Sequence, residues 1–363
     1  MTTYRTEPAP TTDGLLVRTE LPDSWDDWIG RAPATLRRRW ISLAEGRIPG
    51  GARTFGLAGP GGVRVALVGG VMEAPTGHVR FDPQRVLSGG SVEDGVVADG
   101  PHPWQGRRAE ELFPGCLLMA PNYETAPVGP GSRDPRVLRA HLDALLDWCR
   151  GQGIRSVSAL FLRPDHPEFL DVLRGAGFDV VPMVDRSDMN VTWDDLDGYI
   201  ATLRRNQRFS VRRELRDIAA RGIEIVERPI RADEPELLPL RAQLMTKYGA
   251  VPDGEREAAS FRHLRDHFGP DNVWIVEARK GGALLSFTML VRDGDQWTAL
   301  MSGTDYENPD ASFTYFATMF YRPAELAPGQ GITTISYGLG TVQAKKLRGC
   351  TVSTLSAAGL VLD

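Results

Sequence analysis

Hydrophobic residues in the first half of the chain fall into short continuous runs and runs at helical spacing. Residues 63–72 (VRVALVGGVM) and 115–123 (GCLLMAPNY) are short apolar runs bounded by glycine or proline, which is typical of buried strands. Residues 134–153 repeat apolar positions every three or four residues before a glycine, which predicts an amphipathic helix. A strand at 155–162, a short helix at 166–178 and a strand at 179–184 are predicted next. Strands and helices therefore alternate in this half.

The second half repeats this order and adds a meander. Residues 193–222 predict one long helix, 223–229 a strand, and 236–250 and 261–269 two further helices. Three strands follow in 272–305, with turns at Lys280–Gly281–Gly282 and Asp293–Gly294–Asp295. A helix over 312–331, broken near Pro323, and a strand over 332–340 complete the pattern. Helices, a hairpin meander, a helix and a last strand predict an α/β (α+β) unit with a mixed sheet.

The length of 363 residues suits two such units rather than one core. We expect a flexible segment over 1–23, a first domain over 24–188 and a second over 189–363. Residues 25–43 are expected to be helical, and residues 76–114 show little pattern.

The composition of the chain narrows the class of protein. An apolar content of 42% and a charged content of 25% are those of a soluble globular protein. No signal peptide or membrane span is visible, and the three widely spaced cysteines form neither a disulfide framework nor a metal motif, so we expect a cytoplasmic protein without a metal. A net charge of −5 gives no global attraction to nucleic acid. DNA is therefore not an expected partner, and any polyanion would have to bind a local basic patch. The sequence leaves the oligomeric state open.

One such patch stands out in the helix predicted over 193–222. Arg204, Arg208, Arg212 and Arg216 recur at four-residue spacing and so line one helix face. None has an acidic residue three or four positions away, and neighbouring like charges destabilise a helix slightly. The face is either a solvated arginine surface or a site for anions, for which forked guanidinium donors suit phosphate.

A second candidate site follows the last predicted strand. The chain contains only four lysines, and two of them, Lys345 and Lys346, stand together just after Tyr337, Gly338 and Gly340. Glycines at a strand end let backbone approach a ligand closely, and a lysine there could stabilise a phosphate or a developing oxyanion. The alternative is an ordinary surface turn.

These residues resemble the Fem-like, peptidoglycan-biosynthesis-type branch of the GNAT acyltransferase superfamily. LDGYIATLRRNQRFSVRREL is similar to the family's Y-x-x-L-x-x-x-x-R-x-x-x-R-R-E helix, and ISYGLGTVQAKKLRGC to its G-x-G-x-x-x-x-K-x-x-R-G tail. The resemblance, which also includes the meander, covers about residues 190–350. It implies two tandem GNAT-like domains with mixed central sheets flanked by helices, the first of them degenerate. Lys345 falls at the family position, three residues before Arg348, which makes Lys345 the catalytic candidate and adds Arg348 to the phosphate-binding set.

The resemblance implies acyl transfer from an activated ester or thioester to an amine or hydroxyl. Fem-type enzymes use aminoacyl-tRNA, whereas ordinary GNAT enzymes use acyl-CoA held by an R/Q-x-x-G-x-G/A loop before a helix. No good match to that loop is present, which favours aminoacyl-tRNA as co-substrate, with no tightly bound cofactor. An acyl-CoA N-acyltransferase and a non-catalytic binding protein stay open, as does the small-molecule or cell-wall acceptor. Tyr123 and Glu124, at the end of a predicted strand, could line the cleft between the domains.

Overall fold

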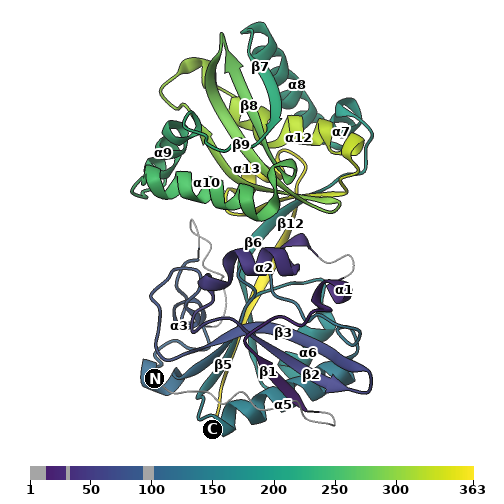
Figure 1. Cartoon of the computed structure of the whole chain (residues 1–363), viewed down its shortest axis with the longest axis vertical. Helices are drawn as coiled ribbons and strands as arrows, with labels where there is room; N and C mark the ends of the chain where they lie inside the picture. The colour runs from purple at the N-terminus through teal and green to yellow at the C-terminus, as the bar shows by residue number, and fades with distance from the viewer. Residues whose placement is uncertain (1–13, 30–32, 93–101) are drawn as a thin grey trace. The chain divides into compact units, whose positions relative to one another are not determined.

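The chain divides into two compact units. The computed structural model describes residues 14–29, 33–92 and 102–363 (Figure 1). The first unit comprises Met1–Asp185 and Ser353–Asp363, and the second comprises Arg186–Val352. The boundary therefore lies three residues before the predicted one at 188/189, and the last residues, which we assigned to the second domain, belong to the first unit.

The first unit contains a sheet in the order β1-β2-β3-β4-β5-β12. Its described strands pair antiparallel except β4 with β5, which are parallel. Its elements are β1 (Leu15–Arg18), α1 (Trp25–Ile29), η1 (Ala34–Leu36), α2 (Arg38–Ala44), η2 (Glu45–Arg47), β2 (Arg53–Gly59), β3 (Gly62–Met72), α3 (Pro83–Leu87), α4 (Ala109–Leu112), β4 (Gly115–Leu118), α5 (Pro135–Gly151), β5 (Ser156–Leu162) and α6 (Pro167–Gly175).

Two expectations for this unit change. Strand β1 lies inside the segment that we expected to be flexible, and it pairs with β2 over four residues; residues 1–13 lie outside the described part of the chain. The helix expected over 25–43 is three short helices, α1, η1 and α2, with residues 30–32 outside the described part. The predicted helix over 134–153 is confirmed as α5, which begins at Pro135 after an Asp134 cap and is followed by Gly153 at φ 71°.

The second unit contains a sheet in the order β6-β11-β10-β9-β8-β7. Both predicted hairpins are confirmed, because two-residue turns at Gly281–Gly282 and Gly294–Asp295 join β8 to β9 and β9 to β10. The elements are β6 (Asp179–Asn190), α7 (Leu196–Thr202), α8 (Arg205–Ala220), β7 (Glu224–Pro229), α9 (Leu237–Lys247), α10 (Gly254–Phe268), η3 (Pro270–Asn272), β8 (Val273–Lys280), β9 (Ala283–Asp293), β10 (Gln296–Thr304), η4 (Pro309–Ala311), α11 (Thr314–Phe316), η5 (Ala317–Tyr321), α12 (Arg322–Leu326), η6 (Pro328–Gln330), β11 (Thr334–Leu339), α13 (Val342–Lys346) and β12 (Thr351–Val361). The first part of β6, as far as Asp185, and the part of β12 from Ser353 onward belong to the first unit.

Helices cover both faces of the second sheet. Figure 1 shows α9 and α10 on one side and α7, α8 and α12 on the other. Val211 and Ile218 of α8 share a buried cluster with Val276 of β8, whereas Phe261 of α10 contacts Phe287 of β9 with ring centroids 6.4 Å apart. Among the described helices of both units, none is long and apolar enough to cross a membrane.

The parallel strands β10 and β11 separate after a short paired stretch. They pair only from Gln296↔Thr334 to Thr298↔Ser336, although β10 continues to Thr304 along β9. The register of β10 against β9 shifts between Ala299 and Met301, which marks a bulge at the point of separation. Backbone groups of a strand point alternately to its two sides, so the groups of β10 that face β11 beyond Thr298 have no partner on β11. This opening, between the carboxyl ends of parallel strands, is where α/β sheets place ligands.

The helix predicted over 193–222 is broken in the structure. Leu203 and Arg204 have extended backbone, with ψ of 157° and 155°, so α7 ends at Thr202 and α8 begins at Arg205. The cause is burial of Leu203, which is 4% exposed and packs so tightly on Gly349 that a Cβ there would lie 2.7 Å from its methyl group. The helix predicted over 312–331 is interrupted before Pro323, as expected. The interruption is a π-helical turn, η5, which directly precedes α12.

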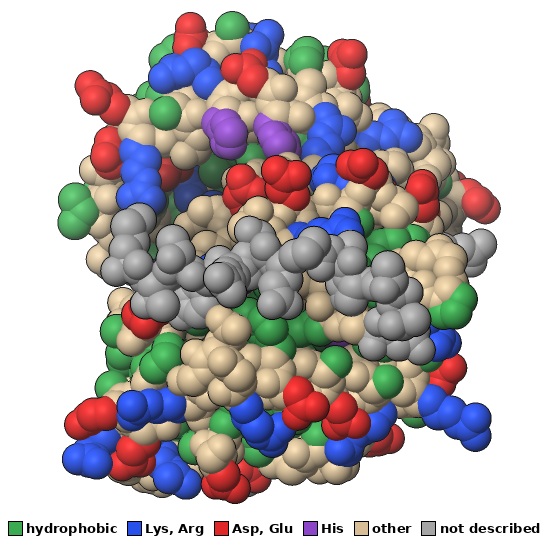
Figure 2. Space-filling view, turned by 60° about the horizontal axis from the view of Figure 1, so that its bottom comes forward, with side chains coloured by type: hydrophobic (Ala, Val, Ile, Leu, Met, Phe, Trp, Pro, Cys, Tyr) green, Lys and Arg blue, Asp and Glu red, His purple; other side chains and the backbone are tan. Residues whose placement is uncertain are grey.

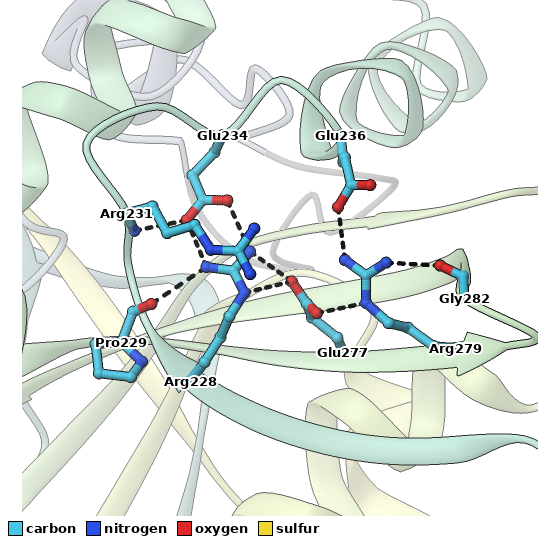
Figure 3. A network of polar contacts seen from close by, with 8 residues as sticks. All are labelled: Arg228, Pro229, Arg231, Glu234, Glu236, Glu277, Arg279 and Gly282. Atoms are coloured by element: carbon cyan, nitrogen blue, oxygen red, sulfur yellow. Dashed lines mark hydrogen bonds and ion pairs between the residues drawn. The ribbon is translucent and has the colours of Figure 1, made fainter.

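A buried ion-pair network fastens the segment after β7 to the sheet. Arg228 lies between two carboxylates that are almost completely buried, Glu234 and Glu277 (Figure 3). Its guanidinium nitrogens lie 2.6 Å and 2.5 Å from the nearest oxygen of each, and Arg279 also donates to Glu277 at 2.7 Å. Each buried negative charge therefore has a nearby positive partner.

We expect Arg228→Met to lower the free energy of unfolding by about 3–5 kcal/mol, because the substitution leaves buried carboxylates without their shared cation. Arg262→Met is the control: Arg262 pairs with Asp233 at 3.3 Å, but both side chains are at least half exposed, and such pairs contribute about 1 kcal/mol or less. Urea denaturation of both variants measures the difference. Equal losses would show that the network adds nothing beyond a surface pair.

Candidate functional site

Lys345 is buried at the end of β11. Its Nζ donates to three successive backbone carbonyls, those of Tyr337 (2.7 Å), Gly338 (3.2 Å) and Leu339 (2.7 Å). The carbonyls converge because Gly338 and Gly340 have positive φ, 61° and 72°, which glycine adopts without strain. Lys345 thus fixes the shape of the chain where β11 ends.

The sequence predicted Lys345 as a mobile charge near a reacting carbonyl, and the structure gives it a different setting. The side chain is 4% exposed, and burial lowers its pKa to about 8. Its three N–H groups already serve the backbone, so the geometry is that of a positioning residue for the end of β11. A direct contact with substrate stays a prediction. Lys346, by contrast, is exposed, and its carbonyl accepts a hydrogen bond from the Gln207 side chain at 3.2 Å.

Arg348 joins the two sequence motifs of the family resemblance. Its guanidinium lies 3.1 Å and 3.2 Å from the two carboxylate oxygens of Glu214, the last residue of the quoted R-R-E pattern. The hydroxyl of Tyr321, in the π-helical turn, also donates to Glu214, and the Phe316 ring lies 3.4 Å from the guanidinium carbon. Arg348 is 8% exposed and neutralised by Glu214. The partner of Arg348 within the protein is thus a buried carboxylate, and its contact with a phosphate stays a prediction.

Tyr337 places a phenol beside this cluster. The residue follows directly after the last position of β11 that pairs with β10, and its ring packs on Phe320 with centroids 4.7 Å apart. It is 5% exposed, and its hydroxyl has no hydrogen-bond partner in the described part of the chain. Burial raises the pKa of Tyr337 well above its usual value, so the phenol stays protonated and able to donate. The hydroxyl of Tyr199, by contrast, has a hydrogen-bond partner, because it donates to the Arg348 carbonyl at 2.8 Å.

The predicted arginine row is present, with one correction. Arg204 caps α8 rather than lying within it, so the four-residue spacing on one helix holds for Arg208, Arg212 and Arg216. Within the described residues, none of the four forms an ion pair with a carboxylate; Arg208 donates to the Ala201 carbonyl at 3.4 Å. On the face drawn in Figure 2, in contrast, acidic and basic side chains are mixed over most of the surface.

Tyr123 and Glu124 lie in the first unit. Tyr123 has a left-handed backbone (φ 63°), stacks on Phe81 with centroids 5.6 Å apart, and accepts a hydrogen bond from Arg80 at 3.0 Å. Glu124 is completely buried and bonded to Thr35 and Arg163. Their predicted place in a cleft between the domains stays a prediction.

Comparisons with known proteins agree with this architecture. Residues 205–346 match the family model described as an acetyltransferase (GNAT) domain. No curated protein matches the sequence. Among solved structures, FemX is similar with a TM-score of 0.58 and 11% identity, over 90% of this chain and 91% of that chain. A conserved protein of unknown function from Bacteroides thetaiotaomicron gives 0.49 and 17%, over 72% and 81%. A tandem GNAT protein from the clavulanic acid biosynthesis pathway gives 0.48 and 11%, over 96% and 98%.

Residues 205–346 of the second unit therefore match a GNAT acetyltransferase domain, which supports a GNAT-type acyltransferase. The chain shares its fold with FemX, so the predicted fold class is confirmed and the predicted Fem-like resemblance holds at the level of the fold.

Sequence reasoning missed three features of this unit. The role of Glu214 was not predicted, because its buried partner lies 134 residues away in the chain. The π-helical turn that brings Tyr321 to Glu214 has no sequence signal beyond the nearby proline. Phe209, in the middle of the arginines, is 65% exposed although a phenylalanine usually favours burial.

The buried lysine predicts a pH-dependent stability. The folded-state pKa is about 8 and the usual value is 10.5, so between these pH values the unfolded chain binds the extra proton and stability rises with pH. We expect the wild type to gain about 3 kcal/mol relative to Lys345→Met between pH 7.5 and pH 10.5.

Chemical denaturation across this range measures the gain, with Lys346→Met as the control, whose difference from wild type should stay constant. A constant difference for Lys345→Met as well would show that the three carbonyls hold the ammonium at its ordinary pKa.

Proposed function

We propose that the protein transfers an aminoacyl group from aminoacyl-tRNA to an amine or hydroxyl of a small metabolite or cell-wall precursor. The proposal starts from the GNAT acyltransferase class and from the likeness of the fold to FemX. It requires a donor that carries an activated ester, and it places the reaction in the cytoplasm, without a tightly bound cofactor. One feature of the structure bears on the identity of the donor.

That feature is the connection from β10 to α11, residues 305–313. In ordinary GNAT enzymes a glycine-rich loop before a helix holds the phosphates of acyl-CoA through free backbone N–H groups. This connection (DYENPDASF) contains no glycine and no basic residue. Its N–H groups are already engaged: that of Tyr306 donates to Gln243 at 2.8 Å, that of Glu307 to Asp305 at 3.3 Å and that of Asp310 to Asn308 at 3.0 Å.

The remaining N–H groups from Asp305 to Ser312 also donate within the protein. Those of Asp305, Asn308, Ala311 and Ser312 reach backbone carbonyls of Leu285, Asp305, Asn308 and Pro309, and residue 309 is proline, which has no N–H. Arg221 in turn holds the carbonyls of Asp310 and Ser312, each at 2.7 Å. A pyrophosphate would therefore find no free backbone N–H group between Asp305 and Ser312, which supports aminoacyl-tRNA over acyl-CoA.

The opening between β10 and β11 suits the transfer step. Attack of an amine or hydroxyl on an ester carbonyl forms a tetrahedral oxyanion, and the leaving ribose oxygen then takes a proton. Backbone N–H groups of β10 that face away from β9, beyond Thr298, can stabilise that oxyanion. The protonated Tyr337 phenol, next to the end of the paired stretch, can donate to an oxygen in the same opening. No covalent enzyme intermediate is needed.

The donor test compares charged tRNA with acyl-CoA. We expect the purified protein to consume intact aminoacyl-tRNA in the presence of a panel of amines and hydroxyl compounds, and to lose this activity when the tRNA is digested with RNase first. The amino acid of the charged tRNA carries a label. Transfer is measured as label in a new product that alkali treatment distinguishes from aminoacyl-tRNA. Full activity with an acyl-CoA donor after RNase treatment would instead assign the protein to acyl-CoA-dependent N-acyltransferases, and ligand binding without turnover to non-catalytic binding proteins.

The lysine pair gives a second test. We expect Lys345→Ala to lower the single-turnover rate of transfer about 100-fold, as loss of an oxyanion-stabilising or site-shaping group typically does. Lys346→Ala, whose side chain is exposed, should stay within a few-fold of wild type. We further expect the wild-type rate to fall as the pH rises through about 8, because the neutral amine has no charge and only two N–H groups for the three carbonyls. Equal, small losses from both variants would remove Lys345 from the site.

A further inference from the structure

The outward face of α8 combines six arginines with one exposed aromatic ring. Phe209 is 65% exposed. At 3.6 residues per turn, it lies about 180° from the middle of the buried face, which is formed by Val211, Glu214 and Ile218. Five arginines of α8 share an arc of about 140° with it and, with the capping Arg204, form what we name the basic face: Arg204, Arg205, Arg208, Arg212, Arg213 and Arg216.

No acidic side chain of α8 balances the basic face. Glu214 points inward and is bound to Arg348, and Asp217 is held by Arg221 at 2.8 Å. Across the described residues, none of the six arginines makes an ion pair with a carboxylate; Arg213 only approaches the Phe313 ring, at 6.0 Å. Like charges one turn apart repel each other, so the face carries a strain that an anionic partner relieves.

The basic face continues onto α13. The Gln207 side chain donates to the Lys346 carbonyl at 3.2 Å, which holds the start of α8 against the end of α13. Lys346 and Leu347 are both exposed, Leu347 to 43%. Over Arg205–Arg216 the helix extends for about 16 Å, enough to contact several successive phosphates.

We infer that the basic face docks the unpaired end of an RNA, with a base stacked on Phe209 and backbone phosphates bound by the arginines. Aromatic side chains interleaved with basic ones bind single strands in this way, because every base has a face that can stack. The inference rests on the proposed function only in identifying the RNA as tRNA, whose aminoacyl group must reach the opening in the same unit.

An anionic membrane surface fits the basic face less well. A helix that lies on a membrane presents a broad apolar face to the lipid. Val211, Leu215 and Ile218 of α8 lie in the core or against it, and the exposed Ala219 and Ala220 are small, so the Phe209 ring would have to provide the insertion. Arginine forks also match individual phosphates bidentately, which suits an ordered nucleic-acid backbone.

The test measures binding of the full chain to a fluorescent single-stranded RNA, to the same sequence as a duplex, and to phosphatidylglycerol vesicles. We expect Phe209→Ala to weaken single-strand binding about ten-fold or more and Phe209→Trp to restore it, with little effect on the duplex. Replacing Arg208, Arg212 and Arg216 together by Gln should lower the slope of log affinity against log salt by about 2. The matched control is Arg262→Gln, an exposed arginine on α10, which should leave binding unchanged.

The outcomes separate the docking surface from the proposed function. Unchanged RNA affinity in both Phe209→Ala and the triple variant, or preferential binding to the vesicles, would overturn the docking surface, even if transfer still depended on intact tRNA. RNA binding that is lost in both variants, in a protein that transfers from acyl-CoA, would support the docking surface and overturn the aminoacyl-tRNA donor.

Discussion

The buried ion pair between Glu214 and Arg348 determines how the second unit is built and how α8 can be used. It joins α8 to the segment after β11, and Tyr321 in the π-helical turn donates a further hydrogen bond to Glu214. Two buried charges are stable only with good geometry and further hydrogen bonds, and this cluster has both. The pair also turns Glu214 away from solvent. One of the two acids that could balance the arginines of α8 is thereby removed from its outer face.

The same segment shapes the opening between β10 and β11. Lys345 gathers three carbonyls at the end of β11, and Arg348, three residues later, is fastened to α8. Both side chains are buried and their partners are within the protein. The K-x-x-R-G motif therefore works as a two-point clamp: one basic residue fixes the end of the strand and the other fixes the following turn to the helix. The backbone of β11 beyond Ser336 is held away from β10 by this arrangement.

The sequence predicted what is encoded locally. Both hairpins, α5 and the order of elements in the second unit follow from glycine turns and hydrophobic period. The break at Leu203 could not be predicted, because it depends on the fit of that side chain against Gly349, far along the chain. Strand β12 (TVSTLSAAGLV) was missed because small residues give it little alternation. The arginine row was recognised, but which of its neighbours face solvent depends on the Glu214–Arg348 pair, which no local pattern reveals.

Under the proposed function, donor recognition would depend on side chains rather than on backbone N–H groups. From Asp305 to Ser312 the backbone N–H groups after β10 all donate within the protein and are not free for a compact pyrophosphate. The unpaired positive charge is found instead along α8, spread over about 16 Å. A compact anion can contact only part of such a row, whereas a chain of phosphates can contact all of it, and the contacts add. Charge placed in this way favours a long polyanion over a nucleotide, even though the whole protein has a net charge of −5.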